Sequence, residues 1–86
     1  MDKISFFKLA MEKSNSDKVI ILTNHYQIHG TVYDCEVCNN DGYVNLTDVS
    51  LCKFDDTYLH TCDEYSKAKY DWLNINLDKV VAFSFV

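Results

Sequence analysis

The chain has 86 residues, of which 48% are hydrophobic and 14% aromatic, so it supports one folded domain and is not a disordered chain. The net charge is −5, and all eight basic residues are lysine. Phosphate contacts dominate nucleic-acid affinity, and arginine is the preferred donor for them, so this balance argues against strong non-specific nucleic-acid binding. This acidic charge balance is equally compatible with a basic protein partner or with a local binding site on an otherwise acidic protein.

The first residues lead into an amphipathic segment instead of an apolar run, and no stretch reaches the length of a membrane span. We therefore expect a cytoplasmic protein with no membrane partner. In that compartment we also expect the thiols to be reduced.

The four cysteines form a weak zinc pattern. Cys35-x-x-Cys38 is accompanied by His60-x-Cys62 and by Cys52. In the predicted hairpin, however, Cys35 and Cys38 tend to face opposite sides of a strand, and Cys52 lies far along the ladder. Free thiols are the expected state, and no metal or other cofactor is predicted.

Residues 2–13 predict a short N-terminal helix. Asp2 can cap its first free amides, and apolar residues recur at helical spacing. We expect this amphipathic helix to cover one open end of a barrel, with partner binding as the alternative. The apolar positions are Ile4, Phe7, Leu9, Ala10 and Met11.

Three strands are predicted next, at residues 18–23, 26–37 and 43–54, because these segments are rich in β-branched or alternating apolar residues. Gly30 falls where the second strand changes phase, which indicates the bulge or bend that a small barrel needs to close. A strong turn precedes the third strand, whose alternation slips near Asp48.

The C-terminal third predicts a polar segment and two more strands. Residues 55–71 have acids early and lysines late, which is typical of a variable acidic hairpin. Residues 72–86 hold the fourth strand and a short apolar fifth strand from Lys79, with Val81, Phe83 and Phe85 on one face. The result is a single domain over residues 1–86: a helix and a small, strongly bent barrel.

The stretch from Val19 to Val49 resembles the first motif of the Sm/LSm family, the small RNA-binding barrels that include bacterial Hfq. Leu22-Thr23-Asn24 matches the end of the family's first strand, and Gly30 matches the glycine of its bent second strand. Asp41-Gly42-Tyr43-Val44-Asn45-Leu46 matches the pattern Asp-x-aromatic or His-apolar-Asn-Leu. The resemblance implies a mainly β fold, an Sm-like antiparallel barrel of five bent strands with an N-terminal helix.

The same resemblance implies a site for single-stranded RNA. In the family the aromatic residue or His stacks on a base, so Tyr43 would stack, Asn45 would read the base edge and Asp41 would orient Asn45. The family's second motif has Arg-Gly where this sequence has Asn76-Leu77, so Asn76 would replace the Arg without its charge. A plain hairpin tip, with Asn45 satisfying backbone groups, is the alternative interpretation.

In this family the fourth strand of one subunit pairs with the fifth strand of the next. The apolar strand at residues 79–86 fits such an edge, which must be covered. We therefore predict a homo-oligomeric ring that binds short single-stranded RNA, with U-rich segments as candidates. The sequence has no Ser-His-Asp spacing, phosphate loop or paired carboxylates, so no enzyme is predicted and no catalytic residue is assigned.

The tail from Leu77 to Ser84 also resembles the last strand of Rof-like proteins, small acidic Sm-like proteins that bind the termination factor Rho. This gives the second hypothesis, an acidic interaction or inhibitor module that binds a basic protein through the hairpin without binding RNA. The carboxylates that would carry this contact are Asp55, Asp56, Asp63 and Glu64.

Overall fold

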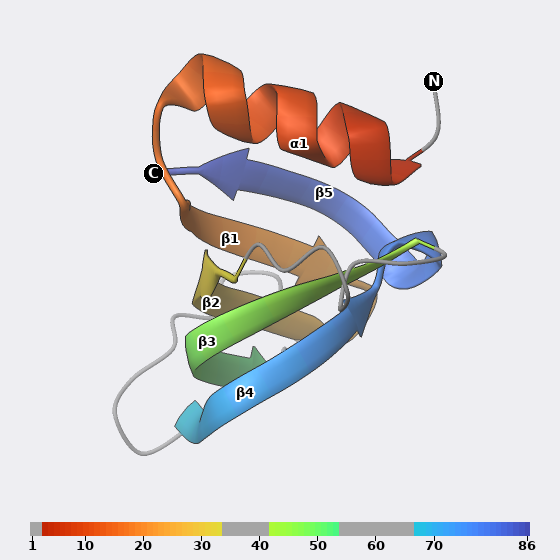
Figure 1. Cartoon of the computed structure of the whole chain (residues 1–86). Helices are drawn as coiled ribbons and strands as arrows, with labels where there is room; N and C mark the ends of the chain where they lie inside the picture. The colour runs from red at the N-terminus through yellow and green to blue at the C-terminus, as the bar shows by residue number, and fades with distance from the viewer. Residues whose placement is uncertain (1–2, 34–41, 54–66) are drawn as a thin grey trace.

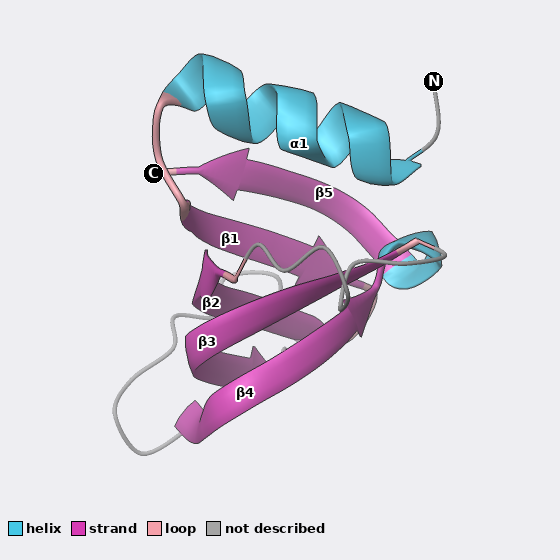
Figure 2. Ribbon diagram, in the orientation of Figure 1, coloured by secondary structure: helices cyan, strands magenta, loops and turns pink. Residues whose placement is uncertain are grey.

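The computed structural model describes residues 3–33, 42–53 and 67–86, and in this part a helix is followed by five strands of one antiparallel sheet (Figure 1). The strand order is β4-β3-β2-β1-β5, so β4 and β5 are the edges. Figure 2 shows the sheet curled on itself, with the helix lying along β5. The elements are α1 (Lys3–Ser14), β1 (Lys18–Thr23), β2 (Tyr26–Val32), β3 (Tyr43–Lys53), β4 (Lys67–Asn76), the 3-10 turn η1 (Leu77–Lys79) and β5 (Val80–Phe85).

Most element bounds agree with the sequence, but β2 and the C-terminal elements differ. β2 ends at Val32 and not at the predicted residue 37, since Tyr33 is not in a strand and residues 34–37 lie outside the described part of the chain. β1 has the predicted bounds, and β3 has nearly the predicted ones. β4 begins at Lys67, before the predicted start at Trp72, so the end of the expected acidic hairpin is strand. β5 begins at Val80, because Leu77–Lys79 form the 3-10 turn.

The sheet bends at Gly30, as predicted. The register of β2 against β3 shifts between His29 and Thr31. A Cβ at Gly30 would lie 3.2 Å from the Cβ of the buried Leu46, which is tighter than an ordinary contact, so glycine favours this close approach of the two strands. On β3 the alternation of apolar and polar residues was predicted to break near Asp48, and Asp48 has a left-handed backbone conformation with a φ of 56°. Both irregularities help the sheet to curl around its core.

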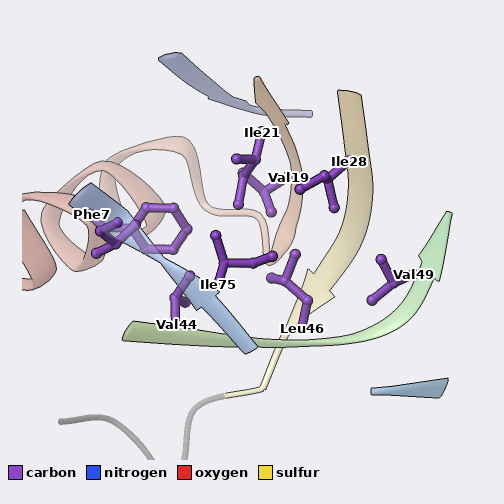
Figure 3. Close-up of a cluster of buried hydrophobic side chains, with 9 residues drawn as sticks. Phe7, Val19, Ile21, Ile28, Val44, Leu46, Val49 and Ile75 are labelled. Atoms are coloured by element: carbon purple, nitrogen blue, oxygen red, sulfur yellow. The ribbon is translucent and has the colours of Figure 1, made fainter. Parts of the chain in front are cut away.

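The core lies inside this curl, and α1 contributes Phe7 to it (Figure 3). The Phe7 side chain is 1% exposed, and its ring centroid lies 4.8 Å from that of Phe83 and 5.0 Å from that of Phe85. Among the other apolar positions expected on the helix, Leu9 is 37% exposed. The buried cluster is Phe7, Val19, Ile21, Ile28, Val44, Leu46, Val49, Ile75 and Leu77.

The face predicted for the last strand is wrong at its first residue. Val81 is 67% exposed, whereas Val80 packs against the core with Phe83 and Phe85. The cause is a register shift in the β1–β5 pair, which matches Thr23 with Val80 but Leu22 with Ala82. Simple alternation counted back from Phe83 therefore fails at Val81.

Cys52 corrects a second expectation. It is 2% exposed on β3 and is disulfide-bonded, so the reduced state expected for the thiols is wrong at this residue. The other three cysteines lie outside the described residues, and the cytoplasmic location stays a prediction. Within the described ranges, no helix is long and apolar enough to cross a membrane.

Candidate nucleic-acid interface

The predicted RNA-binding residues that the structure describes lie on one face of the β3–β4 pair. Val44 pairs with Ile75, and these two side chains point into the core. Directly opposed residues share a face, and successive residues alternate, so the neighbouring pairs lie on the opposite side of the sheet from the core. These pairs are Tyr43 with Asn76, Asn45 with Asn74, and Thr47 with Trp72. We call the surface that they form the outer face.

Two backbone contacts bring the two sequence motifs together. Tyr43 lies directly opposite Asn76, and the backbone N–H of Leu77 donates to the carbonyl of Gly42 at 2.8 Å. Gly42 has a φ of 83°, a conformation that suits glycine and that turns the chain into β3. The structure therefore unites Tyr43 and Asn76 at one end of the outer face, where the Tyr43 side chain is 37% exposed.

Asn45 lies one row further along and is the one buried polar side chain in the described part of the chain, with 2% exposure. Its side-chain carbonyl accepts a hydrogen bond from the side-chain amide of Asn74 at 2.6 Å. Its backbone carbonyl accepts a hydrogen bond from the N–H of Tyr33 at 2.9 Å, so Asn45 is held between Asn74 of β4 and the residue that follows β2. The residue predicted to read a base is thus held by the protein itself.

Asn76 is also engaged. Its side-chain oxygen accepts a hydrogen bond from the backbone N–H of Asp78 at 3.0 Å, which caps the 3-10 turn. This places Asn76 in a structural role at the position where the family resemblance implies an Arg. The positive charge nearest to it in sequence is the exposed Lys79 of the same turn.

The turn is anchored to the helix by an ion pair. Lys3 Nζ lies 2.7 Å from Asp78 Oδ1, and both side chains are mostly exposed. The hydrogen bond and the charge of Lys3 hold the pKa of Asp78 below its usual value, and Lys79 adds a smaller effect in the same direction. The start of α1 is therefore linked to the segment that follows Asn76.

An aromatic pair that the sequence reasoning missed completes the outer face. The rings of Tyr33 and Trp72 meet edge to face with centroids 5.1 Å apart, and these side chains are 47% and 45% exposed. Tyr33 follows β2, and Trp72 lies within β4, so the rings meet across β3. The sequence did contain a signal for Tyr33. Counted from the bend at Gly30, residues 31 and 33 fall on the same face of an extended chain. The partner strand and register were needed to place Trp72 beside it.

Asp41 of the RNA site lies outside the described residues, and so do all four carboxylates of the alternative site, Asp55, Asp56, Asp63 and Glu64. Within the described segments, no group of three His, Cys, Asp or Glu side chains could hold a metal ion.

A groove of about 630 Å³ lies between α1 and β5. Its lining is mainly apolar and includes Phe6, Val81 and Phe83. Because β5 is an edge strand, this groove borders backbone groups that have no strand partner on their outer side within the sheet.

Among solved structures, the chain is similar to the Sm protein of Pyrococcus abyssii, whose structure was determined in complex with a uridine heptamer. The TM-score is 0.57, the sequence identity is 15%, and the match covers 100% of both chains. No protein-family model matches the sequence, and no curated protein matches it. The helix, the five antiparallel strands and this structural likeness together establish that the chain has the Sm-like fold.

Proposed function

We propose that this chain is an Sm-like RNA-binding protein that assembles into a homo-oligomeric ring and binds short single-stranded RNA, with U-rich segments as the first candidates. One observation carries the proposal. Tyr43 is an exposed aromatic side chain directly opposite Asn76, at the junction of the two motif segments. Stacking on an aromatic ring beside hydrogen-bonding side chains is how proteins commonly bind unpaired bases.

In this proposal Tyr43 supplies the stacking surface, Asn45 reads the base edge, and Asp41 and Asn76 support it. Because the Asn45 side chain is 2% exposed, a base can hydrogen-bond to it only by entering between its neighbours. RNA binding should therefore perturb the side-chain amide signals of Asn45 and Asn74 together, which an amide-selective NMR spectrum would detect.

The ring is supported by the two edges of the sheet. Among the residues that the structure describes, β4 and β5 are each unpaired on one side, and two such edges from different copies can pair head to tail. The exposed Val81 and the groove beside α1 provide apolar surface that such a contact would cover. Light scattering on a sizing column tests this point, and a monomer at micromolar concentration would argue against the ring.

Binding is tested with a labelled oligouridine and a labelled oligoadenosine of the same length. Tyr43→Ala should weaken binding by about 5- to 150-fold, the loss typical of one stacked base. Tyr26→Ala is the matched control, because Tyr26 and Tyr43 are both 37% exposed and Tyr26 begins β2, away from the outer face. Equal affinities for the two variants would contradict the proposed site.

A further inference from the structure

The aromatic pair of Tyr33 and Trp72 has no role in the core. Both side chains are nearly half exposed, and their edge-to-face contact leaves ring faces open to solvent. Large exposed rings held in a fixed mutual geometry by a sheet are a ready surface for stacking another flat group. The fixed geometry also means that little side-chain entropy remains to be lost when such a group binds.

This pair lies on the outer face but is separate from the position at Tyr43. Trp72 is four residues from Asn76 along β4, which corresponds to about 13 Å at the usual rise of a strand. A single base on Tyr43 therefore cannot also cover Trp72. Between the two positions lies the Asn45–Asn74 row, in which the Asn74 side chain is exposed.

The chemistry of the outer face favours one class of ligand. Its described side chains are aromatic, amide or hydroxyl, from Tyr43 and Asn76 at one end to Thr47 and Trp72 at the other. These pairs include no charged group that would complement a charged protein surface, and no aliphatic side chain that would anchor an apolar one. Aromatic rings alternating with amides fit unpaired bases, which stack on rings and hydrogen-bond along their edges.

We propose that Tyr33 and Trp72 form a second base-stacking position for single-stranded RNA, with Asn74 as its hydrogen-bonding side chain, next along the strand from the base at Tyr43. This inference rests on the proposed function and extends it from one base to a path along the outer face. An oligonucleotide long enough to reach both positions gains affinity from the second one, whereas a mononucleotide does not.

The experiment uses the fluorescence of Trp72, which is the only tryptophan in the chain. The full-length protein is titrated with uridine monophosphate and with a uridine heptamer, while Trp72 emission and the anisotropy of a labelled heptamer are followed. We expect the heptamer, but not the mononucleotide at equal site occupancy, to quench Trp72. Trp72→Thr and Tyr33→Ala should each weaken heptamer binding by about 5- to 150-fold.

Three controls make the result decisive. Trp72→Phe keeps an aromatic ring and should retain most of the affinity, Tyr26→Ala should bind as the wild type does, and thermal unfolding reports whether each variant folds. Should Trp72→Thr fail to fold, quenching in the wild type and the Tyr33→Ala affinity still decide the matter.

The outcomes separate the two proposals. In the first outcome, the heptamer binds and needs Tyr43, but Trp72 emission does not change and Trp72→Thr and Tyr33→Ala bind as the wild type does. This result overturns the second position and leaves the proposed function standing. No binding of either RNA by the wild-type protein overturns both. Quenching with the predicted loss of affinity supports the second position.

Discussion

The side-chain amide of Asn74 donates a hydrogen bond to the side-chain carbonyl of Asn45, at 2.6 Å across the β3–β4 pair. Asn45 is 2% exposed, whereas Asn74 is exposed, so a surface residue satisfies a buried one. A buried polar group that loses its partner costs more than the hydrogen bond itself contributes, because its desolvation is no longer compensated.

Asn74→Ala should therefore lower the free energy of unfolding by about 1–3 kcal/mol. Urea denaturation followed by circular dichroism measures the change. The control is Asn24→Ala at an exposed turn position, which should stay within about 0.5 kcal/mol of wild type. A double replacement of Asn45 and Asn74 by Val should cost less than Asn74→Ala, since it removes both side chains of this hydrogen bond together. A more damaging double variant would refute this account.

Gly30→Ala should destabilise the protein by about 1–3 kcal/mol, because the new Cβ would lie 3.2 Å from two side-chain atoms of Leu46, a fully buried residue that would have to shift within the packed core. Gly42→Ala should also cost about 1–2 kcal/mol, but for a different reason. Apart from its chain neighbours, no described residue has an atom within 4 Å of a Cβ at Gly42, and the cost there comes from its φ of 83°.

Asparagine distinguishes these two causes, because it tolerates the left-handed conformation. Gly42→Asn should recover most of the stability lost in Gly42→Ala, whereas Gly30→Asn should be worse than Gly30→Ala. If asparagine restored stability at both positions, the requirement for glycine at residue 30 would not come from steric crowding.

Much of the fold was predictable because local signals agreed with the tertiary structure. A glycine at the phase change of a strand predicted the bend at residue 30, and a β-branched run predicted β1 with its bounds. Val81 could not be placed by alternation, because the 3-10 turn and a register shift intervene. The start of β4 at Lys67 was missed because the lysines at residues 67 and 69 of this edge strand do not resemble an apolar strand.

The candidate site was only partly predictable. The motif identified Tyr43, Asn45 and Asn76, and the structure brings all three to neighbouring rows. Their partners depend on which strands pair and in what register, which residue spacing alone does not specify. Hence Asn74 and the Tyr33–Trp72 pair were not assigned. The disulfide at Cys52 was missed because the spacing of four cysteines does not specify which of them lie close enough to pair.

Phe7→Ala should be the most destabilising change in α1, at about 3–5 kcal/mol, because it leaves a cavity against the rings of Phe83 and Phe85. The adjacent Phe6→Ala is the control. Phe6 is 55% exposed and makes one looser ring contact with Phe83 at 6.3 Å, so its loss should cost about 1 kcal/mol or less. Thermal unfolding of both variants measures the difference, and similar melting temperatures would contradict the packing described for α1.

Stability should depend slightly on pH through Asp78. Lys3 lowers the pKa of this carboxylate in the folded state, so the ion pair contributes stability above the unfolded pKa and loses it as the pH falls through the folded pKa. The pair is exposed, so salt should weaken it.

An NMR titration of Asp78 measures this effect directly. Lys3→Gln should raise the pKa of Asp78 towards its usual value. Lys13→Gln, at the other end of α1, should leave the pKa unchanged. An unchanged pKa in Lys3→Gln would mean that the ion pair does not persist in solution.

Lys79→Gln tests the electrostatic part of RNA binding. Lys79 is exposed in the turn after Asn76, and we expect it to contact a phosphate near the base at Tyr43. The slope of log K against log salt should then become shallower by about 0.7, the value for one phosphate contact on a single strand. Lys53→Gln, at the far end of β3 from Tyr43, should not change the slope. Identical slopes for both variants would exclude Lys79 from the interface.

The bend at Gly30 and Asp48 has a consequence for assembly geometry. These residues lie between the two edges of the sheet, so the curvature they impose fixes the angle between β4 and β5 within one copy. In a head-to-tail assembly each copy is rotated from the last by that angle, and the number of copies that closes a circle follows from it. If the chain forms the proposed ring, a substitution at the bend that the fold tolerates would change the subunit count, and with it the diameter of the central opening.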